Sequence, residues 1–252
     1  MLHFDDIVFG PIFSRRLGSS LGVNLLPSKG KLCNFDCVYC ECGWNRDGRS
    51  DHVFPTYDEV AAALTERMSK ASAEGVRVDS VTFSGNGEPT MHPDFPAIID
   101  LTLSLRDRFF PEAKVSVLSN ATLIGRKEVA EALMKVDNPI LKIDASSDEL
   151  VAMINKPAGR YRLAETVEAL KKFEGRFVLQ TMFLRSPEFD TASPEALVAW
   201  MDIVREIRPR EIMVYTIDRE TPDKSLAKYT VDEMAAFVKP LVDEGFRIQV
   251  RG

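Results

Sequence analysis

Hydrophobic residues along this chain form two alternating patterns: short runs rich in β-branched residues, and longer segments with apolar residues three or four positions apart. The short runs predict buried β-strands, and the longer segments predict amphipathic α-helices. Six strands are expected at residues 21–26, 78–83, 115–118, 140–145, 177–183 and 212–215, and residues 246–250 have the pattern of a seventh.

The helical segments begin at capping sequences. Thr56 and Thr230 each stand three residues before a glutamate, which is the pattern of a capping box, and Ser193 precedes Pro194 as an N-cap and first-turn pair. One helix is expected to begin at residue 56, others to cover residues 94–109, 126–136, 161–174 and 193–207, and a last helix from residue 230 to bend near Pro240.

This alternation of strands and helices predicts a parallel sheet joined by right-handed crossovers. Six strand–helix units make an α/β fold of the partial (β/α)6 barrel type; a full eight-unit barrel is the alternative, although the sequence does not supply eight units. No linker rich in Gly, Ser or Pro interrupts the pattern, so residues 1–252 are expected to form one domain. In such folds the active site lies beyond the carboxyl ends of the strands.

Charge and composition narrow the class of protein. The chain has 252 residues and a formal net charge of −6, which argues against a protein that coats nucleic acid non-specifically. No apolar run approaches the ~20 residues that span a bilayer, and residues 1–10 lack the features of a signal peptide. A soluble, cytoplasmic protein with no membrane partner is therefore expected.

All four cysteines lie between Cys33 and Cys42, in a loop expected at residues 28–55, directly after the first strand. A disulfide framework would spread them along the chain, so a tight cluster in an intracellular protein indicates a metal site. At the spacing Cys33-x3-Cys37-x2-Cys40, each thiolate can hold one iron of a cubane iron–sulfur cluster, which leaves the fourth iron open to an exchangeable ligand. The alternative is a zinc site that recruits Cys42, although Cys40 and Cys42 are awkwardly close for joint tetrahedral ligation.

The three-cysteine spacing after the first strand resembles the signature of the radical S-adenosylmethionine (SAM) superfamily, with Tyr39 at the position of its usual aromatic residue. The resemblance implies an enzyme with a [4Fe–4S] cluster on Cys33, Cys37 and Cys40, whose open iron is chelated by SAM. It further implies reductive cleavage of SAM to methionine and a 5′-deoxyadenosyl radical that abstracts hydrogen from a substrate. A reducing partner such as flavodoxin or ferredoxin would supply the electron, and Tyr39 would pack near the adenine.

Two further segments resemble SAM-binding motifs of this superfamily. The segment Gly85-Asn86-Gly87-Glu88 follows the second strand, where the family has a Gly-Gly-Glu motif that holds the SAM amino group. Asn86 stands where the first glycine is expected, or the loop carries one inserted residue, which leaves open the carbonyl that faces the amino group. Asn120 follows the third strand, where the family uses polar residues for the SAM carboxylate or ribose; the alternative is a residue that caps the next turn.

Polar residues also occupy the later strands. Lys142 and Asp144 share one face of the fourth strand, where Asp144 is expected either to bind the ribose or to form a structural ion pair with Lys142. Gln180 in the fifth strand is a candidate polar contact to SAM, and Tyr215 ends the sixth strand, near where the family binds adenine.

The start of the chain bears on the substrate, because residues 9–22 resemble a short group of radical SAM proteins related to wybutosine-synthesis enzymes, which act on tRNA. Basic residues in two strand-end loops are expected to gather at the mouth of the site and bind an anionic substrate: Arg15, Arg16, Lys156, Arg160 and Arg162. RNA, a phosphorylated compound or a peptide would suit them, and a set of solvated surface residues is the alternative. The alternatives to an enzyme are a non-catalytic iron–sulfur electron-transfer protein and a zinc-stabilised binding module.

Overall fold

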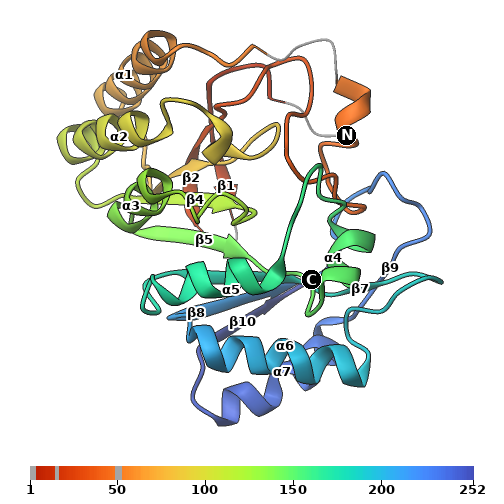
Figure 1. Cartoon of the computed structure of the whole chain (residues 1–252). Coiled ribbons are helices and arrows are strands. Elements are labelled where there is room, and N and C mark those ends of the chain that lie inside the picture. Colours follow the sequence, from red (N-terminus) through yellow and green to blue (C-terminus); the bar gives the residue numbers. More distant parts are fainter. Residues whose placement is uncertain (1–3, 15–16, 49–52) are drawn as a thin grey trace.

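The chain folds around a curved eight-stranded sheet (Figure 1). This computed structural model describes residues 4–14, 17–48 and 53–252. In spatial order the strands are β1 (Val8–Ser14), β2 (Gly18–Val23), β3 (Ser80–Phe83), β4 (Lys114–Ser119), β5 (Asn138–Lys142), β6 (Val178–Met182), β8 (Glu211–Tyr215) and β10 (Ile248–Arg251). β1 pairs antiparallel with β2, and all the other neighbours in this sheet pair in parallel.

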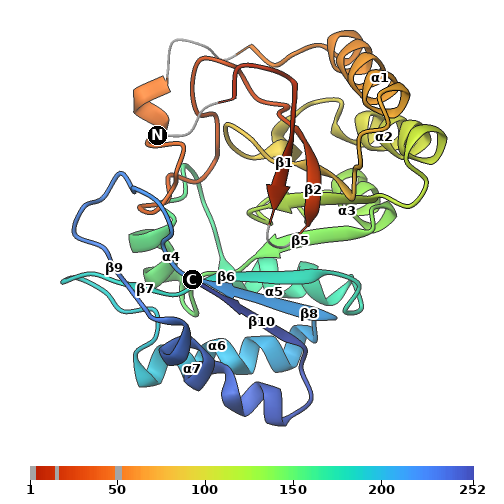
Figure 2. The ribbon, with the colours of Figure 1, turned by 180° about the vertical axis from the view of Figure 1, so that it is seen from behind.

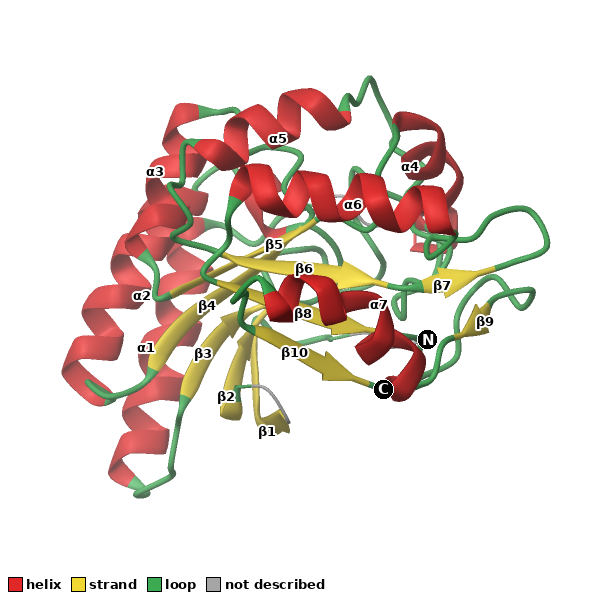
Figure 3. Cartoon of the chain, turned by 90° about the horizontal axis from the view of Figure 1, so that it is seen from below, coloured by secondary structure: helices red, strands yellow, loops and turns green. Residues whose placement is uncertain are grey.

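Helices fill the connections between the strands. They are α1 (Tyr57–Ala73), α2 (Phe95–Phe109), α3 (Lys127–Lys135), α4 (Asp148–Ile154), α5 (Leu163–Lys171), α6 (Pro194–Ile207) and α7 (Val231–Asp243), with short 3-10 turns η1 (Asn45–Gly48) and η2 (Pro89–Met91). Figure 3 shows α1, α2, α3, α5 and α6 along the outer face of the sheet. Both expected capping boxes are present, at Thr56 and Thr230, and α7 continues as one helix through Pro240. Within the described ranges, no helix is both long and apolar enough to cross a lipid bilayer.

The sheet curls without closing on itself. Its order, β1-β2-β3-β4-β5-β6-β8-β10, places β1 and β10 at the two edges (Figure 2). Six parallel strands, from β2 to β8, each lead into a helix, and β10 adds a further parallel strand after α7. The predicted partial (β/α)6 barrel is confirmed, and β10 corresponds to the strand expected at residues 246–250.

Four elements go beyond the expected pattern. β1 forms a hairpin with β2, although Gly10 and Pro11 interrupt its alternation of side chains. The short α4 begins at Ser147, whose hydroxyl accepts a hydrogen bond from the Leu150 N–H at 3.2 Å. A separate two-stranded sheet pairs β7 (Leu184–Arg185) with β9 (Ala227–Lys228).

The two faces of the sheet differ in polarity. Phe83 is fully buried against Phe95 of α2, with ring centres 6.3 Å apart, and belongs to the core between sheet and helices. The preceding residue, Thr82, points to the other face, because side chains alternate along a strand. There its hydroxyl bonds to the hydroxyls of Ser20 at 2.7 Å and Ser80 at 3.0 Å. Hydroxyl groups therefore line the inside of the barrel at β2 and β3, whereas Ile140, Val178 and Met213 form a small apolar cluster across β5, β6 and β8.

Candidate functional site

A cavity of about 580 Å³ opens at the carboxyl ends of the parallel strands. Its volume lies within the range of small-molecule and cofactor sites. Ten of the residues selected from the sequence line this cavity: Cys33, Cys37, Tyr39, Cys40, Gly85, Gly87, Glu88, Asn120, Gln180 and Tyr215. The fold thus brings together residues from the cysteine loop, the loops after β3 and β4, and the strands β6 and β8, whereas Asn86 and Asp144 lie outside the cavity wall.

Two neighbouring segments hold the cysteine loop in place. On one side, the Asp36 N–H donates to the carbonyl of Asn155, at the end of α4, over 2.8 Å. On the other side, the Leu32 N–H donates to the carbonyl of Asn86, in the loop after β3, also over 2.8 Å. The backbone is therefore fixed directly before Cys33 and directly before Cys37.

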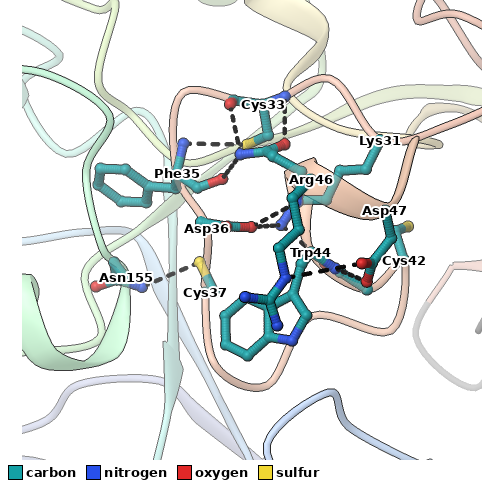
Figure 4. A network of polar contacts seen from close by, with 12 residues as sticks. Lys31, Cys33, Phe35, Asp36, Cys37, Cys42, Trp44, Arg46, Asp47 and Asn155 are labelled. Atoms are coloured by element: carbon teal, nitrogen blue, oxygen red, sulfur yellow. Dashed lines mark hydrogen bonds and ion pairs between the residues drawn. The ribbon is translucent and has the colours of Figure 1, made fainter. Parts of the chain in front are cut away.

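N–H groups donate to two of the cysteine sulfurs (Figure 4). Cys33 Sγ accepts from the Phe35 N–H at 3.4 Å, and Asn120 Nδ2 lies at 3.6 Å from the same sulfur. Cys37 Sγ accepts from Asn155 Nδ2 at 3.3 Å. Donors of this kind orient and stabilise sulfur ligands of metal centres.

The sulfur donors fit an iron–sulfur cluster better than a single ion. Within the part of the chain that the structure describes, no three His, Cys, Asp or Glu side chains come close enough to ligate one metal ion. A cubane cluster binds each cysteine through a different iron, so Cys33, Cys37 and Cys40 need only face the same cavity, as they do. Cys42 lies outside the cavity wall, and its Sγ donates to the Gly85 carbonyl at 3.4 Å. A zinc site that recruits Cys42 would need its thiol to leave the Gly85 carbonyl.

A buried lysine lies among the cysteines. Lys31 is 4% exposed, and its ammonium group donates to Asp36 Oδ1 at 3.0 Å and to the Gly43 carbonyl at 3.1 Å. Burial acts to lower the pKa of Lys31, but the cysteine thiolates and Asp36 together raise it, so the amine stays charged. Burial raises the pKa of Cys37 to about 11, and the nearby Lys142 ammonium and the Asn155 hydrogen bond oppose this shift toward the neutral thiol.

The loop after β3 approaches the cysteine loop closely. Gly87 and Leu32 form a parallel β-bridge, and a Cβ at Gly87 would overlap the carbonyl oxygen of Leu32, so this position requires glycine. The Asn86 side chain is fully buried and turned to the start of the chain. It accepts from the Phe4 N–H at 2.9 Å and donates to the Pro27 carbonyl at 3.0 Å. This side chain supports the loop instead of forming the cofactor contact expected from the sequence.

Glu88 connects the ends of β3 and β4 at the cavity wall. It is 2% exposed, and its carboxylate accepts from the Thr90 N–H at 3.1 Å, the Thr90 hydroxyl at 2.5 Å and the Ser119 hydroxyl at 2.9 Å, all through Oε1. Oε2 accepts from the Asn120 N–H at 2.7 Å. Burial raises the pKa of Glu88, and these donors oppose that effect. Oε2 retains a lone pair for a donor on a bound ligand.

Asn120 combines the two roles considered for it. Its side-chain oxygen accepts from the N–H and the hydroxyl of Thr122, at 3.1 and 2.7 Å, which is the turn-capping role. Its Nδ2 donates to Asn34 Oδ1 at 2.7 Å, and so connects the loop after β4 with the cysteine loop. Because Asn120 also lines the cavity, capping and ligand contact are compatible at this position.

A lysine joins two tyrosines at the cavity wall. Lys142 Nζ donates to the Tyr215 hydroxyl at 2.7 Å and to the Tyr39 hydroxyl at 3.0 Å. The Tyr39 hydroxyl donates in turn to Asp144 Oδ2, which also accepts from Asn155 Nδ2 at 2.9 Å. Asp144 therefore lies behind Tyr39, with Oδ2 at 3.9 Å from Lys142 Nζ. The structure favours the ion-pair alternative for Asp144 over direct contact with a ribose.

The basic residues expected at the mouth are engaged elsewhere. Arg160 pairs with Glu165 at 2.5 Å and Arg162 pairs with Asp148 at 2.9 Å, and both arginines are exposed. The Lys156 ammonium lies over an indole ring of the cysteine loop, 5.2 Å from its centre. None of these three residues lines the cavity, so their predicted role in binding an anionic substrate is wrong. Each of the three contacts a carboxylate or an aromatic ring outside the cavity.

Apolar residues of β1 line the opening of the cavity, and two other basic residues, Arg219 and Arg251, also line its wall. Ile12 and Phe13 line the opening and are 51% and 81% exposed. The two remaining members of the expected basic group, Arg15 and Arg16, lie outside the described residues.

Comparison with known sequences identifies the family. A family model described as the Radical SAM superfamily matches residues 28–190, which is more than half of the chain. A UPF0026 protein of Methanocaldococcus jannaschii is 28% identical over 223 residues, covering 86% of this chain but only 65% of that protein, just under two thirds of its length. A UPF0026 protein of Helicobacter pylori is 29% identical over 231 residues, covering 90% of this chain and 71% of that protein.

Solved structures share the fold. SuiB of Streptococcus suis bound to S-adenosylmethionine has a TM-score of 0.66 and 18% identity, and the match covers 89% of this chain and 49% of SuiB. Archaeal TYW1 has a TM-score of 0.52 and 12% identity, over 90% of this chain and 72% of TYW1. At these identities the likeness establishes the fold alone. The family match spans the cysteine loop and the loops after β3 and β4, and the chain belongs to the radical SAM superfamily of enzymes, whose members bind a [4Fe–4S] cluster and SAM.

Proposed function

We propose that this enzyme holds its [4Fe–4S] cluster on Cys33, Cys37 and Cys40 and cleaves SAM reductively. The observation that carries the proposal is that these three thiols line one cavity with the loop after β3, whereas Cys42 does not. When bound, the cluster supplies the electron that breaks the S–C5′ bond of SAM, which gives methionine and a 5′-deoxyadenosyl radical that abstracts hydrogen from the substrate.

The cavity wall offers polar groups that match the parts of SAM. Glu88 Oε2 and the backbone of Gly85 and Gly87 suit the amino group, because carboxylate and carbonyl oxygens accept from an ammonium. Asn120 and Gln180 suit the carboxylate and ribose. The rings of Tyr39 and Tyr215 suit the adenine.

Two of the residues selected from the sequence act through their neighbours. Asn86 holds the loop that carries Glu88 by bonding to the start of the chain. Asp144 accepts from the Tyr39 hydroxyl and so fixes the orientation of that ring at the cavity wall. Neither residue needs to touch SAM for its loss to weaken SAM binding.

Substrate entry is proposed at the β1 side of the cavity. The exposed Ile12 and Phe13 there favour an apolar portion of the substrate over a phosphate backbone. SuiB, which shares the fold, has also been solved bound to its precursor peptide SuiA, so a peptide is the first class of substrate to test. A one-electron donor such as flavodoxin or ferredoxin would act on the cluster, and residues 1–252 would form one radical SAM core domain.

EPR spectroscopy tests cluster and cofactor together. Protein reconstituted anaerobically with iron and sulfide, then reduced, should give the signal of a [4Fe–4S]+ cluster, and adding SAM should change that signal because SAM binds the open iron. A cluster signal that SAM leaves unchanged would favour the electron-transfer alternative, and absence of any cluster would overturn the proposed function.

A further inference from the structure

Asn155 joins the end of α4 to the second cysteine of the loop (Figure 4). The residue is 2% exposed, and its Nδ2 donates to Cys37 Sγ at 3.3 Å and to Asp144 Oδ2 at 2.9 Å. An amide NH2 group has two hydrogens, so each of these acceptors can receive one. Asn155 lies outside the wall of the cysteine cavity, and its amide reaches a proposed cluster ligand from behind.

The carboxylate of Asp144 determines which end of the amide faces the sulfur. A carboxylate only accepts hydrogen bonds, so the amide nitrogen, and not its oxygen, must point toward Asp144 and Cys37. Asp144 is itself held by the Met182 N–H at 3.0 Å and by the Tyr39 hydroxyl. The donor to sulfur is therefore fixed in one orientation by the protein alone.

The backbone of Asn155 holds the same loop. Its carbonyl accepts from the Asp36 N–H at 2.8 Å, and its own N–H donates to the Val151 carbonyl within α4, also at 2.8 Å. Backbone and side chain together keep the amide at a constant distance from Cys37. Both groups are buried, where the electrostatic effect of a hydrogen bond is larger than in water.

We propose that Asn155 is a positioning residue that raises the reduction potential of the cluster through its N–H···S bond to Cys37, with Asp144 holding the amide in place. This role presupposes the cluster on Cys33, Cys37 and Cys40 proposed above. Reduction brings one electron from an external donor onto the cluster, with no covalent bond made or broken, so the sulfurs gain negative charge. An N–H donor stabilises the more negative state more strongly, and hydrogen bonds to sulfur help to set cluster potentials.

The test is the midpoint potential of the cluster in Asn155→Leu, which has a side chain of similar size but no donor. Reconstituted protein would be titrated with titanium(III) citrate in the absence of SAM, while EPR follows the reduced cluster. We expect a lower midpoint potential, with the ratio of reduced to oxidised cluster at the wild-type midpoint falling about tenfold, as for the loss of one hydrogen bond to a charged group.

Asn138→Leu is the matched control. Asn138 donates from its side chain to the Ser116 hydroxyl at 3.1 Å, at the start of β5, which is the end of the strand opposite the cavity. The substitution removes the same chemical group at a distance from the cysteine loop, so its midpoint potential should equal that of the wild type.

The outcomes separate this role from the proposed function. An unchanged midpoint potential in Asn155→Leu with full iron content would overturn the role of Asn155 and leave the proposed function standing. If the leucine variant binds no cluster, Asn155→Ala, which removes the donor without adding bulk, is titrated instead, with a lower midpoint again expected. Should neither hold a cluster, pulsed EPR of reduced Asn120→Ala protein with 15N-labelled asparagine side chains decides, because this variant lacks the other asparagine amide that donates to a cysteine sulfur. A nitrogen coupling that persists in it supports the Asn155 bond, and its absence overturns it. Wild-type protein that takes up no iron overturns the proposed function instead.

Discussion

Buried polar side chains in this protein occur in connected sets, so one substitution leaves several partners unpaired. Across the described residues, every buried side-chain nitrogen and oxygen has a hydrogen-bond partner. Glu88 is a clear case, because its carboxylate serves donors on Thr90, Ser119 and Asn120. Removing such an acceptor costs the desolvation of each donor left behind.

Glu88→Ala should therefore affect both stability and SAM binding. We expect the free energy of unfolding to fall by about 2–3 kcal/mol, because buried donors lose their acceptor. SAM affinity should fall at least about tenfold with the loss of a charge-assisted bond, while iron content stays that of the wild type. Denaturant unfolding, calorimetry with SAM and iron analysis measure the three quantities. Glu112→Ala, at an exposed position, is the control. Unchanged SAM affinity in Glu88→Ala would remove Glu88 from the SAM site.

Cys42→Ala should keep the cluster. The Cys42 thiol bonds to the Gly85 carbonyl and lies outside the cavity wall, so its loss leaves the three proposed ligands in place. Reconstituted Cys42→Ala should contain about four irons per chain, whereas Cys37→Ala should not hold the cluster. Iron contents that fall equally in the two variants would show that Cys42 is a fourth ligand, and the argument for an open iron would fail.

At the scale of elements, the sequence predicted those strands and helices whose formation depends on neighbouring residues. The parallel strands and the longer helices follow from hydrophobic periodicity and capping boxes. β1 was missed because Gly10 and Pro11 break its alternation, and its antiparallel pairing with β2 is a tertiary contact that this broken pattern does not predict. The seven residues of α4 are too few to show a helical period, although Ser147 before two acidic residues was a usable N-cap signal.

The candidate site divides in the same way. The cysteines and the loop after β3 were found because each forms a motif of closely spaced residues in the sequence. Asn155 was missed because its bond to Cys37 spans 118 positions, and no local pattern reports such a contact. Arg160 and Arg162 were misassigned because charge and position in a loop do not show which carboxylates an arginine contacts. In the structure they pair with Glu165 and Asp148.

Gly87→Ala should separate the loop after β3 from the cysteine loop. The added Cβ would overlap the Leu32 carbonyl oxygen and force the loop after β3 away from the cysteine loop. We expect a lower melting temperature and a large loss of iron after reconstitution, measured by thermal unfolding and metal analysis. Gly125→Ala is the control, because a Cβ there meets open space. A Gly87→Ala protein with wild-type iron content and stability would show that this close approach is not required.

At the scale of the whole molecule, the cavity lies between the two open edges of the partial barrel. β1 and β10 form the two edges of the sheet, and residues of both strands line the cavity. The chemistry is thus expected to be carried by the strand ends and their loops, and the outer surface to contribute little.

Charge reversal on that surface should leave SAM chemistry unchanged. The double variant Arg160→Glu and Arg162→Glu breaks two exposed ion pairs, which contribute little to stability. The rate of SAM cleavage without substrate should equal that of the wild type at low and at high salt, measured as release of 5′-deoxyadenosine. A marked loss of cleavage at low salt would return these arginines to the functional site.

The most direct test of the central claim is the release of 5′-deoxyadenosine itself. Anaerobically reconstituted wild-type protein, reduced with titanium(III) citrate and given SAM, should release 5′-deoxyadenosine and methionine in equal amounts, as resolved by liquid chromatography. Cys33→Ala, Cys37→Ala and Cys40→Ala should release neither product. A fully loaded and reduced wild-type protein that leaves SAM intact would contradict the assignment of this cavity as a site of reductive SAM cleavage.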